Sequence, residues 1–222
     1  MAVLIMSVVD ANDLLFGNFS DSLSKLEEIE KFREHFERFL EQERDYFEGA
    51  HTDLQIEYLP LFADTFPPIL HSSIVISVAI LLELEMRGYC AALREALDLD
   101  LRLGDLAGSI LDRFKAYTTR VARLDVDFIE ARWEDTVGIF EIRNCLVHSG
   151  GNLGEFSRAS VIRAFAARHS TPTCEADGLR IGPETSSVVL SIATDFLYVI
   201  YNSALSRFPG RWGPLPHQTH KA

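Results

Sequence analysis

The sequence predicts an all-α fold: an up-and-down helical bundle of about five to six helices with one small β-hairpin insertion. Apolar residues recur at three- and four-residue steps along several long segments, as they do on the buried face of an amphipathic helix. One turn signal, Asp177-Gly178, lies between two short segments in residues 173–181 and predicts the hairpin. With 222 residues, 47% of them hydrophobic, the chain can bury the core of one ordinary domain.

The first long helix is expected over residues 22–48, with residues 20–22 as its cap and residues 1–21 as an N-terminal extension. Its apolar stripe comprises Ile29, Phe32, Phe36, Phe39 and Leu40. We expect the three phenylalanines to lie in the core, because they belong to this stripe, and not to form a platform on which bases stack.

A second long helix is expected from Ile69 to about Leu97, after a shorter arm over residues 53–63 that Phe66-Pro67-Pro68 ends. Its first half is apolar nearly all round, which predicts burial among other helices, and its second half should emerge into solvent. Residues 66–82 are almost free of charge and reach the lower limit of about 17 residues for a membrane span. Their two prolines, one histidine and three serines favour a buried central helix over a membrane span.

The second half of the chain continues the helical pattern. Residues 98–108 are expected to form a linker. Ser109 and Asp112 form a capping box, which predicts the start of a third helix with its own apolar stripe. The further helices are expected over residues 128–148, 157–169 and 185–206, the first of them ended by Gly150-Gly151. The domain prediction is therefore an extension over 1–21, a bundle over 22–206 and an irregular tail over 207–222.

Charge is unevenly distributed along the chain. The net charge of −12 argues against a protein that coats nucleic acid by bulk electrostatics. Residues 1–109 hold 21 acidic and 8 basic residues, whereas residues 110–170 hold 8 acidic and 9 basic residues. The middle segment is thus compatible with a local site for a phosphate-bearing ligand, and equally with scattered, solvated charge.

The cysteines and the N-terminus indicate a cytoplasmic protein. Cys90, Cys145 and Cys174 have neither disulfide nor zinc-site spacing, so we expect reduced thiols that are either buried or without a special role. Residues 1–9 are apolar but lack the basic region and the cleavage site of a secretory leader.

The residues with the clearest chemical potential lie at the end of the helix expected over 128–148. Arg143 and Asn144 are followed, after three apolar or small residues, by His148. Arginine is a permanent cation that can clamp a phosphate, and histidine transfers protons near neutral pH. This segment resembles the signature of HEPN domains, in which an arginine and a polar residue precede a histidine by a few positions.

The resemblance implies a dimeric helical bundle that acts as a metal-independent endoribonuclease without a cofactor, with Arg143, Asn144 and His148 as catalytic residues. It further implies RNA as substrate, a toxin or phage-defence setting, and an antitoxin or nucleotidyltransferase partner. The composition of residues 66–82, given above, predicts no membrane association. The alternative is a non-catalytic helical module that binds a partner protein or a nucleotide.

Helix geometry limits how the motif can work. At about 100° per residue, Arg143 and His148 diverge by about 140° on a straight helix. Either the helix ends near Val147 and frees the histidine, or the site combines residues of two copies, as the resemblance implies. The apolar residues Val137, Phe140, Ile142 and Val147 cannot all face inward, which leaves some of them for an interface.

Three weaker candidates remain open. Cys145 and His148 could form a thiol–base pair, although a core cysteine is favoured. His217 and His220 have metal-compatible spacing but are interpreted as surface histidines. Glu83 and Glu85 could approach the site, although a solvated helix end is the preferred interpretation.

Overall fold

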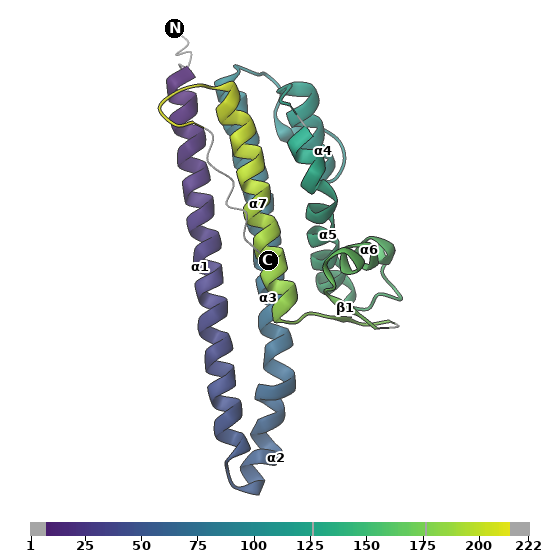
Figure 1. The fold of residues 1–222 in the computed structure, drawn as a ribbon. Coiled ribbons are helices and arrows are strands. Elements are labelled where there is room, and N and C mark those ends of the chain that lie inside the picture. Colours follow the sequence, from purple (N-terminus) through teal and green to yellow (C-terminus); the bar gives the residue numbers. More distant parts are fainter. Residues whose placement is uncertain (1–7, 126, 176, 214–222) are drawn as a thin grey trace. The chain divides into compact units, whose positions relative to one another are not determined.

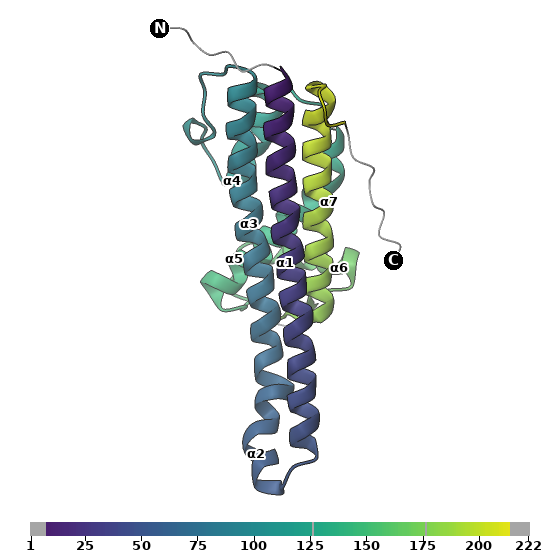
Figure 2. The same ribbon diagram turned by 90° about the vertical axis from the view of Figure 1, so that its left-hand side faces the viewer.

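The fold is all-α with one antiparallel β-hairpin, as predicted from the sequence (Figures 1 and 2). The structure is a computed structural model that describes residues 8–125, 127–175 and 177–213. Its helices are α1 (Val8–Glu48), α2 (Thr52–Pro60), α3 (Phe66–Ala96), α4 (Ile110–Ala116), α5 (Asp127–Ser149), α6 (Ala159–His169) and α7 (Pro183–Arg207). Short π-helical turns occur at η1 (Leu61–Thr65) and η3 (Tyr117–Val121), and a 3₁₀ turn at η2 (Leu103–Asp105).

The chain forms two compact units, and helices α1, α3, α5 and α7 each contribute residues to both. Unit 1 comprises Met1–Lys25, Ile80–Thr136 and Ile192–Ala222, and unit 2 comprises Leu26–Ala79 and Val137–Ser191. In both, the segments of α1 and α5 run opposite to those of α3 and α7, as Figure 1 shows. This alternation is the predicted up-and-down arrangement.

Unit 1 has an aromatic core. Tyr89 of α3, Phe114 of α4, and Phe196 and Tyr201 of α7 are each fully buried. The ring centroids of Tyr89 and Tyr201 lie 5.1 Å apart, edge to face, and the Tyr89 hydroxyl donates a 2.6 Å hydrogen bond to the carbonyl of Ile200. Burying such rings supplies a large apolar area, and the hydrogen bond satisfies the phenol that is buried with it.

Helix α1 begins at Val8, well before the start predicted at residue 22. Ser22 does not cap it but lies inside it, fully buried, and donates from Oγ to the carbonyl of Asn18 at 2.7 Å. The early turns are held by the segment after α7. The Asn12 amide donates to the carbonyls of Phe208 and Trp212, at 2.8 Å each, which only the folded chain brings near.

Unit 2 packs helix α6 closely on helix α5. Phe165 of α6 is fully buried and lies against Gly138 of α5, where an added Cβ would overlap its ring. The predicted hairpin is confirmed as β1 (Thr173–Cys174) paired antiparallel with β2 (Leu179–Arg180), and Cys174 lies opposite Leu179. Backbone hydrogen bonds tie this hairpin to the loop after α5: Leu179 N donates to Gly151 O and Leu153 N to Asp177 O, both at 2.9 Å.

The prediction that Phe32, Phe36 and Phe39 lie in the core is wrong. Their exposed fractions are 47%, 38% and 44%. They belong to a series of neighbouring rings that continues through Phe62 to Phe47 and Phe66. At this end of unit 2, α1 pairs with α2, η1 and the start of α3 (Figures 1 and 2), and neither α2 nor η1 contains a buried residue. Because no other described element of unit 2 covers this hairpin, its aromatic side chains stay accessible.

Helix α3 is also less enclosed than its composition predicts. Ile69 in its first half is 58% exposed, whereas Glu85 in its second half is buried and lies 3.3 Å from Lys25. The prediction that Phe66-Pro67-Pro68 ends the preceding arm is wrong: α2, η1 and α3 follow one another without a break, and the π-helical turn η1 directly precedes the two prolines. By length and composition alone, Thr52–Ala96 and Pro183–Arg207 could cross a membrane, a test that core helices of soluble proteins also pass.

Candidate functional site

The predicted motif lies on the last turns of α5, within unit 2. Arg143, Asn144 and His148 are all helical, because α5 continues to Ser149. The predicted glycine stop is present: Gly150 and Gly151 have φ values of 57° and 82°, and Gly151 N donates to Cys145 O at 3.1 Å. Glycine, which has no Cβ, adopts such positive φ values at the least steric cost. The helix therefore ends after His148, not before it.

Three contacts fix the position of the motif helix. Phe165 packs on Gly138, one turn and a half before the motif. The buried carboxylate of Glu141 forms an ion pair with Arg158, which lies at the start of α6, and the distance from Arg158 Nη1 to Glu141 Oε1 is 2.8 Å. Cys145 is fully buried, so the face of the helix that carries Cys145, opposite Arg143, points into the core. The motif thus lies on a helix that α6 and the hairpin loop hold in place.

The structure brings Arg143 and Asn144 together but leaves His148 apart from them. Arg143 Nη1 donates to Asn144 Oδ1 at 2.9 Å, and both side chains are partly exposed. His148 is exposed, and its side chain makes no hydrogen bond or ion pair with the described residues. Because the helix continues past His148, the side chains of Arg143 and His148 diverge by about 140° in one chain. A helix that ends near Val147 and frees His148 is therefore not the way in which Arg143 and His148 could form one site. The other arrangement, a site that combines residues of two copies, stays a prediction.

The apolar residues expected at an interface are mostly buried within the chain. Phe140 is 4% exposed and Ile142 is fully buried, whereas Val137 is half-buried. Only Val147, at 51% exposed, lies beside His148 on the surface. The apolar area that this set offers to a second copy is therefore smaller than the sequence suggested.

The weaker candidates are largely resolved. Burial raises the pKa of the Cys145 thiol, so this cysteine belongs to the core, as favoured, and does not pair with the exposed His148. His217 and His220 lie outside the described residues. Glu83 pairs with Arg87 at 2.7 Å and Glu85 with Lys25, which gives both carboxylates local partners in unit 1. No group of three or more metal-ligating side chains occurs within the described ranges.

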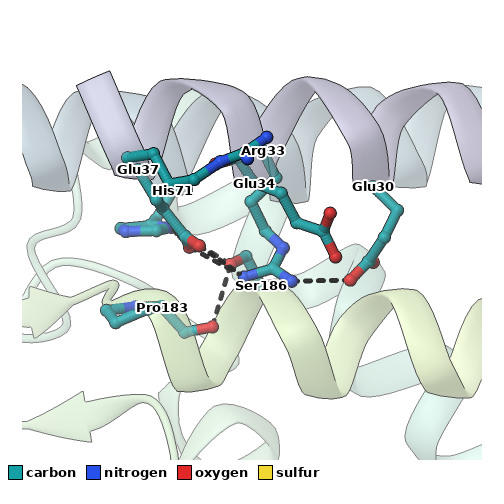
Figure 3. A network of polar contacts seen from close by, with 8 residues as sticks. Glu30, Arg33, Glu34, Glu37, His71, Pro183 and Ser186 are labelled. Carbon is teal, nitrogen blue, oxygen red and sulfur yellow. Dashed lines mark hydrogen bonds and ion pairs between the residues drawn. The ribbon is translucent and has the colours of Figure 1, made fainter. Parts of the chain in front are cut away.

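A second arginine–histidine cluster, which sequence analysis missed, lies inside unit 2 (Figure 3). Arg33 of α1 donates to Glu30 at 2.6 Å and to both oxygens of Glu37 at 2.7 and 2.9 Å. His71 of α3, only 2% exposed, has its Nδ1 3.1 Å from Ser186 Oγ of α7 and 3.8 Å from Glu37 Oε1. This cluster therefore connects three helices through polar contacts.

The hydrogen bonds in this cluster argue against a serine nucleophile. The hydroxyl of Ser186, which is fully buried, donates to the carbonyl of Pro183 at 2.9 Å, so its oxygen is the acceptor for His71. His71 directs the same ring nitrogen at both Ser186 and Glu37, whereas a catalytic relay uses the two nitrogens for base and orienter. The pKa of His71 is lowered, chiefly by burial and also by Arg33, although Glu37 and Glu184 oppose the shift. His71 is therefore neutral near pH 7, and its hydrogen bond with Ser186 serves the packing of the helices.

One sequence signal could have pointed to this cluster: His71 is the single titratable residue in the apolar segment 66–82. Its partners Arg33 and Glu37 are hidden among the many charges of α1. Comparison of the chain with protein-family models, with curated proteins and with solved structures finds no match.

Proposed function

We propose that the protein is a metal-independent endoribonuclease of the HEPN type. The observation that supports this most is the end of α5, where an arginine held by an asparagine and an exposed histidine occupy consecutive turns of a fixed helix. His148 can deprotonate the 2′-hydroxyl of RNA or protonate the leaving 5′-oxygen. Arg143 can bind the phosphate and offset the charge of the transition state.

The contact within the motif suggests a definite task for Asn144. Its amide oxygen accepts from Arg143 Nη1, so Asn144 orients the guanidinium in this proposal. A guanidinium that is oriented before substrate arrives loses less entropy on binding phosphate. The reaction would leave a 2′,3′-cyclic phosphate and a 5′-hydroxyl, and DNA, which has no 2′-hydroxyl, would resist.

The active species in this proposal is a homodimer in which Arg143 of one chain acts with His148 of the other. The divergence of the two residues on one continuous helix supports this arrangement. A cytoplasmic toxin or phage-defence system, with an antitoxin or nucleotidyltransferase partner, is the proposed setting and follows from the motif resemblance alone.

Complementation tests the composite site. Arg143→Ala and His148→Ala chains are purified, mixed, unfolded and refolded together, and RNA cleavage is measured. Random pairing makes half of the dimers mixed, each with one intact site out of two, so about a quarter of wild-type activity should return. Each variant refolded alone is the control. Return of no activity above these controls, although mixed dimers form, contradicts a site shared between chains.

A second function, a non-catalytic module that binds a partner protein, is favoured by a different observation. The exposed rings of Phe32, Phe36 and Phe39 form an apolar surface of the kind that marks protein contacts. A wild-type protein that leaves RNA intact but whose partner binding is lost in Phe36→Ser would support this function instead.

A further inference from the structure

Unit 1 contains an open cavity of about 470 Å³ between α3 and the segment formed by Arg102 and the start of η2. Its lining consists of Arg87, Cys90, Ala91 and Arg94 from α3, and Arg102, Leu103 and Gly104 from the second segment. This volume falls within the range of small-molecule sites, which is about 300–1,000 Å³. The cavity is separate from the motif, since its residues belong to unit 1 and the motif to unit 2.

The charge of the lining stands out against the chain around it. The first 109 residues contain 21 acidic and only 8 basic residues, yet three of those bases line this one cavity and no acidic side chain does. Arg87 and Arg94 are seven positions apart and so lie on the same face of α3. Arg102 approaches from the other segment. The cavity is therefore a local concentration of positive charge.

Local hydrogen bonds hold the parts of this lining in place. Arg94 Nε donates to the carbonyl of Leu99 at 3.1 Å, which uses one of its five N–H donors. The backbone of Arg102 is fixed by a turn in which Arg102 N donates to Asp105 Oδ2 at 2.8 Å. Arg87 pairs with Glu83 at 2.7 Å, so its charge is partly offset, and the side chain is 48% exposed. Arg94 and Arg102 thus carry most of the attraction for an anion.

The remaining lining is small or apolar. Ala91, Leu103 and Gly104 leave a surface against which a flat or apolar group can lie. Cys90 adds no charge, because burial raises the pKa of its thiol. Guanidinium groups recognise phosphate through paired hydrogen bonds, and several together match a ligand with two or more negative charges.

We propose that this cavity binds a small organic phosphate, with its phosphates on Arg94 and Arg102 and its organic part against Ala91 and Leu103. A nucleoside diphosphate has this combination of groups. This inference does not depend on ribonuclease activity, because it concerns different residues in a different unit.

Calorimetric titration of the full-length protein at low salt tests the proposal, with adenosine diphosphate, pyrophosphate and adenosine as probes. We expect the diphosphate to bind below about 1 mM, pyrophosphate to bind more weakly, and adenosine alone not to bind. Arg102→Gln should weaken binding about tenfold or more, since a charge-assisted contact is lost. Arg38→Gln, the same change at an exposed site on α1, is the matched control and should bind as wild type.

Two further variants separate loss of the site from loss of the fold. Ala91→Leu keeps every charge but fills part of the cavity, so it should weaken the nucleotide more than pyrophosphate. Arg87→Gln should have a smaller effect than Arg102→Gln, because Glu83 already offsets Arg87. Circular dichroism confirms that each variant is folded. Absence of binding by wild type, or equal weakening by Arg38→Gln and Arg102→Gln, overturns the proposal.

Discussion

Unit 2 contains two arginine–histidine pairs that differ in nearly every physical respect. Arg33 and His71 are 9% and 2% exposed, come from different helices, and both contact Glu37. Arg143 and His148 come from one helix, and the histidine is exposed. Only the second pair was visible as a motif. The comparison teaches that a pair of residue types does not by itself indicate chemistry: burial and partners decide whether the polar atoms serve the fold or face a ligand.

The largest expected difference between the two pairs is in RNA cleavage. Arg143→Ala or His148→Ala should each lower the cleavage rate by about 10²–10⁴-fold, because each removes a group that acts on the transition state. His71→Asn should leave the rate within about threefold at temperatures where it is folded, since His71 is enclosed among α1, α3 and α7. Cleavage is measured on a labelled single-stranded RNA.

The matched controls for these variants are His35→Ala and Arg38→Ala, two exposed residues on α1. They remove the same groups from the surface without touching either pair. Equal activity of His148→Ala and His35→Ala would break the comparison, because the exposed histidine would then have no chemical role.

The second effect is on stability, and it has the opposite pattern. Arg33→Ala should lower the free energy of unfolding by about 2 kcal/mol, since three short contacts with Glu30 and Glu37 are lost and Glu37 stays near the interior. Arg143→Ala should cost less than about 1 kcal/mol, because its contact with Asn144 is partly exposed. Urea unfolding of both variants at pH 7 measures the difference. Equal costs would show that burial does not distinguish the two arginines.

A smaller effect concerns pH. The folded state lowers the pKa of His71, whereas the unfolded chain has the ordinary value of about 6.5. Below about pH 6.5 the unfolded chain therefore binds a proton that the folded chain resists, so stability should fall as pH drops toward the folded value. Above that range the contribution is constant.

Urea midpoints between pH 5 and pH 8 measure this dependence. His71→Asn should flatten the decline below pH 6.5 relative to wild type. An unchanged slope in His71→Asn would mean that protonation of His71 does not oppose folding.

The smallest expected effect is that of chelation. Cleavage should persist in excess EDTA, because the proposed chemistry needs only the guanidinium and the imidazole of the exposed pair. Activity that is lost on chelation and restored by Mg²⁺ would assign the reaction to residues other than Arg143 and His148.

The sequence by itself determined the elements that depend on local physics. Helical periodicity located α4, α6 and α7 to within a few residues, and the capping box at Ser109 is formed with Asp112, as predicted. The stop at Gly150-Gly151 and the hairpin at Asp177-Gly178 also follow from backbone preferences that act within a few residues. The placement of the motif on the last turns of α5 follows from the same local signals.

Tertiary structure alone decided which apolar and polar residues are buried. The stripe that contains Phe36 has the pattern of a core face, but a hairpin of two helices offers no third layer to cover it. Residues 8–21 are helical because Asn12 and Phe16 gain partners near Trp212, about 200 positions away. His71 is enclosed because α1 and α7 pack beside α3. Burial depends on which segments meet in space, and periodicity describes only one segment at a time.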